Sequence, residues 1–157
     1  MSEPIALRQA VAADASAVRA LTREAYAKWV PRIGREPKPM AADYEAAVRN
    51  HRIDLLYVDG ALAALIETID QGHRLLIENL AVSPAHQRRG LGSKLVAHAE
   101  TIAAALGHDE VWLYTNRRFE GNVELYSRLG YRIDSEEPID GGMLRTNMSK
   151  RIAPRRD

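Results

Sequence analysis

A glycine-bearing segment, Gln87-Arg88-Arg89-Gly90-Leu91-Gly92-Ser93, constrains the fold more than any other part of this chain. It follows the apolar run Leu75–Val82, which predicts a strand, and it opens a stretch with apolar residues at helical spacing from Leu91 to Leu106. At such a strand-to-helix junction, the unpaired N–H groups of the first helical turn coincide with the positive end of the helix dipole. Because glycines let a phosphate approach the backbone closely, the segment is predicted to bind a phosphate-bearing ligand.

Other interpretations of Gln87–Ser93 compete with this one. A P-loop requires a Gly-Lys-Ser/Thr sequence, and Gly92-Ser93-Lys94 has the wrong order. A dinucleotide-binding fingerprint requires a third glycine where Leu95 stands, and Leu95 belongs to the apolar face of the helix. The last alternative, a tight turn whose arginines simply face solvent, stays open when the segment is considered alone.

Turn residues and apolar periodicity divide the rest of the chain into short elements. We expect strands at 5–7, 54–58, 61–69, 75–82, 111–115, 131–133 and 143–148, and helices at 15–30, 41–50, 91–106 and 120–129. Three prolines and a glycine predict that Pro31–Pro39 is a stiff irregular loop, and Asp59-Gly60 predicts a hairpin. The order β-α-α-β-β-β-α-β-α-β-β indicates the α+β class with a mixed sheet. We expect a single domain over residues 1–157, with 151–157 as a mobile tail.

Composition and charge argue against several classes of partner. Lys and Arg number 22 and Asp and Glu 21, which is too balanced to indicate nucleic-acid binding. No apolar run approaches the roughly 18 residues of a membrane span. The absence of cysteine and of a signal-like N-terminus favours a cytoplasmic protein, and the five histidines show no metal-ligand spacing. We therefore expect no membrane, nucleic-acid or metal partner, and a homodimer on the frequency of twofold symmetry alone.

Two motifs taken together resemble those of the GNAT superfamily of N-acetyltransferases. Gln87–Ser93, which follows Glu78–Pro84, is similar to the acetyl-CoA signature Gln/Arg-x-x-Gly-x-Gly/Ala of that family. The segment from Asn122 to Tyr131 is similar to its later motif, Asn-x-x-x-Tyr-x-x-x-Gly-Phe/Tyr. The order of strands and helices matches over almost the whole chain, although Ala15–Asn50 matches only in secondary structure. The resemblance implies a GNAT-like mixed, mostly antiparallel central sheet flanked by helices.

The resemblance also implies a co-substrate and the residues that hold it. These residues form a pyrophosphate loop, a strand whose backbone pairs with the pantetheine arm, a cofactor-contacting asparagine and a tyrosine near the thioester sulfur. The implied acetyl-CoA-binding residues, with CoA as the product, are Leu80, Ala81, Val82, Gln87, Arg88, Arg89, Gly90, Leu91, Gly92, Ser93, Asn122 and Tyr126.

Acyl transfer from a thioester to an amine needs one group that accepts a proton and one that donates a proton. Without a cysteine or a Gly-x-Ser-x-Gly elbow the chain has no obvious nucleophile, which favours direct attack in a ternary complex. We expect Tyr126 to be the acid, because a phenol of pKa about 10 can protonate a thiolate of pKa about 8.5; a packed aromatic is its alternative role. Glu78 shares strand parity with Leu80 and is the candidate base. Its alternative roles are binding of the acceptor ammonium and a structural ion pair.

The acceptor is the least specified part of this prediction. Tyr26, Trp29 and Tyr44 flank Pro31–Pro39 and are candidates to wall an acceptor pocket, although aromatic residues at such spacing commonly belong to a core. The stiff proline segment favours a small amine as acceptor. A protein or peptide amine acetyltransferase, and a non-catalytic acyl-CoA-binding module, stay open as alternatives.

Overall fold

The computed structural model describes residues 4–154, which divide into two compact units. We describe each unit by itself. The first contains residues 4–68 and 79–95, and the second contains residues 69–78 and 96–154. Strand β4 (Leu75–Val82) and helix α5 (Leu91–Ala105), which have the predicted positions, each contribute residues to both units. The single domain over 1–157 stays a prediction, and residues 155–157 of the predicted tail lie outside the described residues.

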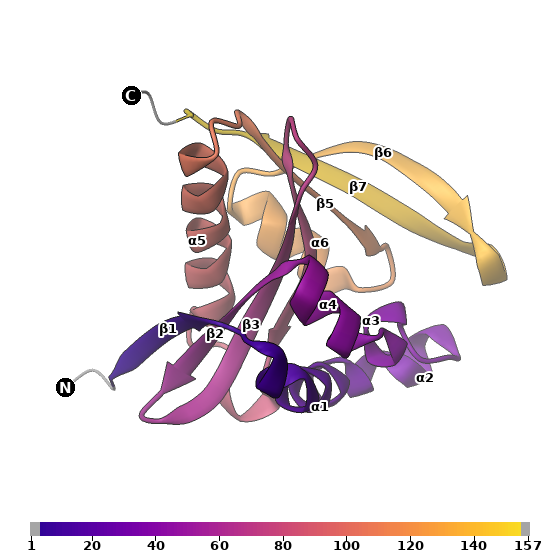
Figure 1. The fold of residues 1–157 in the computed structure, drawn as a ribbon. Coiled ribbons are helices and arrows are strands. Elements are labelled where there is room, and N and C mark those ends of the chain that lie inside the picture. The colour runs from indigo at the N-terminus through magenta and orange to yellow at the C-terminus, as the bar shows by residue number, and fades with distance from the viewer. Residues whose placement is uncertain (1–3, 155–157) are drawn as a thin grey trace. The chain divides into compact units, whose positions relative to one another are not determined.

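The first unit contains an antiparallel set of strands, β1 (Ile5–Gln9), β2 (Arg52–Val58) and all but the last two residues of β3 (Ala61–Asp70) (Figure 1). The turn between β2 and β3 is the predicted hairpin. Asp59 and Gly60 have φ angles of 49° and 80°, the left-handed pair that a two-residue type I′ turn requires. The hairpin therefore forms because Asp and Gly readily adopt the left-handed backbone conformation of this turn.

Helices α1 (Ala15–Tyr26) and α4 (Tyr44–Asn50) supply the apolar side chains that cover this set of strands. The buried cluster comprises Ala10, Ala15, Val18, Leu21, Ala25, Tyr44, Ala47, Ile53, Leu55, Leu65 and Ala81. Asp14, the residue before α1, makes no side-chain capping bond to that helix. Its carboxylate instead accepts hydrogen bonds from Arg8 and from the Val11 backbone N–H, each at 2.8 Å.

The proline-rich segment Pro31–Pro39 is not the irregular loop that its composition predicts. It contains most of α2 (Val30–Ile33) and the start of α3 (Lys38–Ala41), and each of these short helices has a proline in its first turn. The N–H groups of a first turn have no partner within the helix, so a residue without an N–H and with a fixed φ is accommodated there. Gly34, at φ 72°, ends α2.

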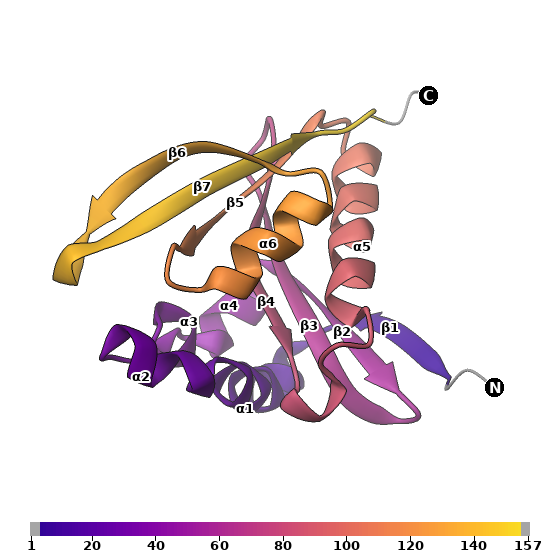
Figure 2. The same ribbon diagram turned by 180° about the vertical axis from the view of Figure 1, so that it is seen from behind.

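The second unit contains β5 (Glu110–Asn116), α6 (Glu120–Arg128), β6 (Arg132–Ile139) and β7 (Met143–Arg151) (Figure 2). Strand β7 pairs antiparallel with both β5 and β6. Strand β5 pairs in parallel with the first half of β4, where Leu76 lies opposite Trp112. Along β5 the side chains alternate between buried and half-buried, so one face of this strand packs into the core and the other is accessible.

The C-terminal strands differ from their predicted bounds. Pro138, expected in a connection, lies within β6 opposite Leu144, and β6 is the last strand in the order, where a missing N–H is tolerated. Strand β7 extends through Arg151, whose guanidinium donates to Asp109 at 2.7 Å. The segment predicted as a tail therefore begins inside a paired strand.

The strand order is β1-β2-β3-β4-β5-β7-β6, and this topology confirms the predicted mixed, mostly antiparallel sheet. Among residues 4–154, no helix is both long enough and apolar enough to cross a membrane. Within the same range, no cluster of three or more histidine, aspartate or glutamate side chains could hold a metal ion.

Candidate active site

The glycine-bearing segment lies in the first unit, where it connects the end of β4 to the start of α5. The Gly90 carbonyl accepts the N–H of Lys94 at 3.1 Å, so the helical hydrogen bonds begin at Gly90. The N–H groups of Leu91, Gly92 and Ser93 therefore belong to the first turn, where no intrahelical acceptor exists. Arg88, Arg89 and Gly90 are exposed. The segment thus combines unpaired N–H donors, a helix dipole and arginine charge.

Backbone conformation explains why glycine occupies position 90. Both Arg88 and Gly90 have left-handed φ angles, of 66° and 78°. A Cβ atom added at Gly90 would meet no atom within 4 Å, so the φ angle and not crowding makes glycine the favourable residue. The Gln87 side chain fixes the start of the segment, because its amide donates to the Val82 carbonyl at 3.2 Å.

The predicted strand residues Leu80, Ala81 and Val82 end β4 in the first unit. Ala81 is 2% exposed and belongs to the buried cluster. The carbonyl of Leu80 accepts from the Tyr26 hydroxyl at 3.3 Å. Tyr26 is thereby held against the backbone of the strand that the resemblance assigns to pantetheine.

A buried polar network around Asn79 contains two of the predicted acceptor residues. The Asn79 side chain is 3% exposed, and its amide nitrogen donates to Thr22 at 3.2 Å and to the Tyr44 hydroxyl at 3.3 Å. Its amide oxygen accepts from Tyr26 at 3.0 Å, while the Tyr44 hydroxyl donates to the Pro39 carbonyl at 2.6 Å.

The three aromatic residues predicted to line an acceptor pocket differ in their exposure to solvent. Tyr44 is 1% exposed, so its ring could contact an acceptor only if the core opened. Tyr26 and Trp29 are half-buried, and Lys28 and Arg32 place their charged groups 5.1 and 5.6 Å from the Trp29 ring. Of the three, only Tyr26 and Trp29 thus have accessible surface that could line an acceptor pocket.

Replacing Asn79 with alanine should lower the free energy of unfolding by about 3 kcal/mol, because buried partners lose their hydrogen bonds. Urea denaturation measures this change. Asn50→Ala, at the exposed last residue of α4, is the matched control and should leave stability nearly unchanged. Equal stability of the two variants would contradict a structural role for the Asn79 network.

Tyr126 and Asn122, the predicted residues of the later motif, lie on α6 in the second unit. The Tyr126 side chain is 4% exposed and packs edge-on against Tyr131, with ring centroids 5.6 Å apart. Within the described residues, its hydroxyl has no hydrogen-bond partner. Burial raises the pKa of Tyr126 above that of an ordinary phenol, so the group keeps its proton at neutral pH. The Asn122 amide donates to Thr115 across a long 3.4 Å contact.

Glu78, the predicted base, is also in the second unit and is half-buried at the middle of β4. Its two carboxylate oxygens both accept from the Tyr114 hydroxyl, at 3.1 and 3.2 Å. Among residues 4–154, no cationic side chain lies within ion-pair distance of the Glu78 carboxylate, whose hydrogen-bond donor is the Tyr114 phenol. The carboxylate is thus oriented by a donor that leaves its negative charge uncompensated.

Tyr114 contacts the predicted base Glu78, and neither Tyr114 nor its neighbour Arg145 was identified from the sequence. The Arg145 guanidinium carbon lies 4.1 Å from the centroid of the Tyr114 ring. Both belong to the accessible face of the second unit, since Tyr114 lies opposite Asn147 and Asn116 lies opposite Arg145. The sequence signal was the two-residue periodicity of a strand, which places Tyr114 on one face of β5 but does not identify the neighbouring strands.

Comparisons with known proteins extend these observations. Residues 17–131 match the sequence profile of the acetyltransferase (GNAT) family. Streptothricin acetyltransferase of Streptomyces lavendulae is 32% identical over 75 residues, a match that covers 46% of this chain and 40% of that protein. The chain therefore matches less than half the length of that relative.

Two solved structures share the fold. The ribosomal-protein-S18-alanine N-acetyltransferase from Escherichia coli superimposes with a TM-score of 0.78 at 20% identity, covering 98% of this chain and 97% of that one. The PaiA N-acetyltransferase from Thermoplasma acidophilum, in complex with coenzyme A, superimposes with a TM-score of 0.77 at 18% identity, covering 95% and 99%. At these identities, the likeness establishes the fold.

Proposed function

The chain belongs to the GNAT acetyltransferase family, and on this premise we propose that it transfers an acetyl group from acetyl-CoA to a primary amine. The observation that carries the proposal is the geometry of Gln87–Ser93. This segment presents first-turn N–H groups and exposed arginines directly after a strand. The PaiA relative in complex with coenzyme A supports the choice of co-substrate.

We propose that this segment holds the pyrophosphate and that the Leu80–Val82 backbone pairs with the pantetheine amides. A strand backbone can bind an amide-containing arm in the way that a sheet edge binds a peptide. Asn122 and Tyr126 complete the set, as the family motif implies. The residues fit the group, because first-turn N–H donors and two arginines supply the hydrogen bonds and positive charge that a pyrophosphate needs.

In the proposed reaction the amine nitrogen bonds to the acetyl carbonyl carbon, and the carbon–sulfur bond breaks with its electron pair on sulfur. Glu78 accepts the proton that the nitrogen loses. Tyr126 donates a proton to the sulfur, and solvent then restores both groups. The chain contains no cysteine for an acyl-enzyme, so both substrates must be held together, and their alignment is a large part of the catalysis.

A small amine is the acceptor that we favour. The streptothricin acetyltransferase relative supports this choice by its name, whereas the E. coli relative is named for a protein acceptor. A protein or peptide amine is therefore the alternative acceptor. The lack of cysteine supports a cytoplasmic location within this proposal.

Release of free thiol distinguishes an enzyme from a non-catalytic acyl-CoA-binding module. The protein is incubated with acetyl-CoA and a panel of small amines and peptides, and free CoA is measured with a thiol reagent. We expect release that depends on an amine. Acetyl-CoA binding by calorimetry without release for any amine would instead favour the module.

Gly90→Ala should raise the Kd for acetyl-CoA by roughly 5- to 30-fold. A left-handed φ costs a residue with a Cβ roughly 1–2 kcal/mol, so the variant loop relaxes and binding must restore the strained form. Calorimetric titration with acetyl-CoA measures this effect. Gly107→Ala has the same left-handed φ and the same open space, so it controls for strain outside the segment. Wild-type affinity in Gly90→Ala would contradict the assignment of the segment.

A further inference from the structure

Arg145 is a half-buried arginine of β7 whose charge the proposed chemistry does not use. Its Nε donates to the Asn147 side chain at 2.9 Å, and its guanidinium stacks 4.1 Å from the Tyr114 ring centroid. A stacked guanidinium is fixed in orientation and still has N–H donors at its edge. Arg145 is therefore preorganised to donate hydrogen bonds to a further hydrogen-bond acceptor.

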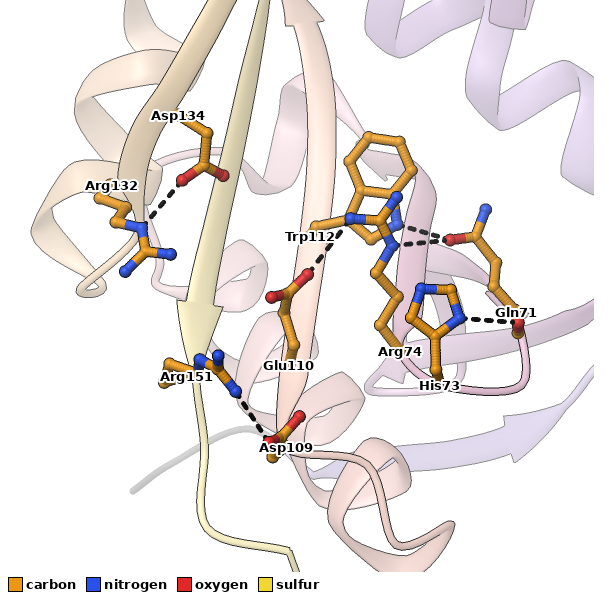
Figure 3. A network of polar contacts seen from close by, with 9 residues as sticks. All are labelled: Gln71, His73, Arg74, Asp109, Glu110, Trp112, Arg132, Asp134 and Arg151. Atoms are coloured by element: carbon orange, nitrogen blue, oxygen red, sulfur yellow. Dashed lines mark hydrogen bonds and ion pairs between the residues drawn. The ribbon is translucent and has the colours of Figure 1, made fainter.

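Several other arginines of the second unit pair with carboxylates. Figure 3 shows Arg74 with Glu110 at 3.2 Å, Arg132 with Asp134 at 2.8 Å and Arg151 with Asp109. Arg74 is the closest analogue, since it stacks 4.1 Å from the ring of Trp112 and also meets its carboxylate partner.

Arg145 has the same kind of aromatic stack without the carboxylate. Glu137 lies opposite it in the β6–β7 register, but the Glu137 carboxylate accepts from Asn147 at 2.8 Å. Across residues 4–154, no carboxylate lies within ion-pair distance of Arg145. A partly buried guanidinium without an anion can form strong, charge-assisted hydrogen bonds to a carboxylate that comes from outside the chain.

Tyr114 connects Arg145 to Glu78. Its ring carries the guanidinium, and its hydroxyl donates to both Glu78 oxygens. All three side chains belong to one face of the second unit, with a negative group at one end of a tyrosine and a positive group over its ring. An acceptor that carries an amine and a carboxylate matches both charges at once.

We propose that Arg145 binds the carboxylate of the acceptor, so that the acceptor is a small amine that also carries a carboxylate. This inference rests on the proposed function, because it assumes that Glu78 receives the amine. Arg145 is then a specificity-determining residue that touches the substrate away from the reacting nitrogen. Discrimination arises because an uncharged analogue leaves the guanidinium without its charged partner.

The test compares α- and ω-amino acids with their primary amides, which keep the amine and lose the carboxylate charge. Thiol release gives kcat/KM for each pair with the wild type and with Arg145→Gln. We expect the wild type to prefer each acid over its amide by roughly 10- to 100-fold, and the variant to lose that preference. Arg117→Gln, which removes an arginine paired with Glu136, is the control and should keep it.

The ratio of acid to amide separates recognition from packing. If Arg145→Gln merely loosened Tyr114, both members of a pair would slow equally and the ratio would persist, which would overturn the inference. Equal rates for acid and amide with the wild type would also overturn it, while leaving the proposed function intact.

If no amine releases thiol, the proposed function fails and calorimetry tests the carboxylate site separately. Acid and amide are then titrated into the wild type and Arg145→Gln, each with CoA present. Tighter binding of the acid that depends on Arg145 supports the site, and equal Kd values overturn it.

Discussion

Replacing Tyr126 with phenylalanine should lower kcat about 10²- to 10⁴-fold and leave the affinity for acetyl-CoA unchanged, because the change removes only the proposed general acid. The Tyr126 side chain is 4% exposed, and within the described residues its hydroxyl makes no hydrogen bond, so its loss leaves no partner unsatisfied. Steady-state kinetics give kcat, and calorimetry gives the Kd. Full activity in the variant would show that another group protonates the sulfur.

The matched control is Tyr131→Phe, in a ring that packs against Tyr126. The Tyr131 hydroxyl donates to Glu100 at 2.9 Å, so this variant should lose about 1–3 kcal/mol of stability and retain kcat. Tyr126→Phe should therefore lower kcat, whereas Tyr131→Phe should lower stability. A loss of kcat in both would indicate that the packing of the pair, and not the Tyr126 proton, limits the rate.

The pH profile gives an independent test of the same assignment. Burial disfavours the phenolate and raises the pKa of Tyr126, so the proton-donating form is fully present below the ordinary phenol pKa of about 10. Below about pH 10, deprotonation of Tyr126 should therefore not lower the activity of the wild type. Any decline in activity over this range should also occur in Tyr126→Phe.

Glu78→Gln should lower kcat/KM about 10²- to 10⁴-fold at neutral pH, because glutamine keeps the shape of the side chain and cannot take the amine proton. The deficit should shrink as the pH approaches the pKa of the acceptor amine, since a neutral amine then needs less help from a base. Rates of thiol release across pH measure this convergence.

Glu110→Gln is the matched control for Glu78→Gln. Glu110 is a partly buried glutamate of the second unit that pairs with Arg74, outside the proposed site, so its substitution should leave kcat/KM unchanged. If Glu78→Gln raised KM alone, at every pH, Glu78 would bind the acceptor ammonium and would not act as the base.

Local patterns were enough to predict the elements that we propose hold the co-substrate. The apolar run Leu75–Val82 and the helix after Gly90 are predicted from residues that are neighbours in sequence. The turn at Asp59-Gly60 is local in the same sense. Pro31 and Pro39 misled the prediction, because proline disrupts a helix interior but fits its first turn, and sequence alone does not give the helix start.

Contacts between distant strands were beyond the reach of these patterns. Tyr114 meets Glu78 because β5 pairs in parallel with β4 at one register, and a shift by one residue would turn Tyr114 to the other face. Arg145 joins them through a second register, that of β7 on β5. The buried Tyr44 likewise accepts a hydrogen bond from Asn79, which is 35 positions away along the chain.

The central claim is direct transfer of acetyl from acetyl-CoA to an amine, and isotope labelling tests it most directly. Acetyl-CoA with a labelled acetyl group is mixed with the protein and an amine that supports thiol release, and mass spectrometry follows both amine and protein over time. We expect the amine nitrogen to gain one labelled acetyl group while the protein stays unlabelled at every time point. A labelled protein that passes its acetyl group on to the amine, or an amine that gains no label, would contradict the claim.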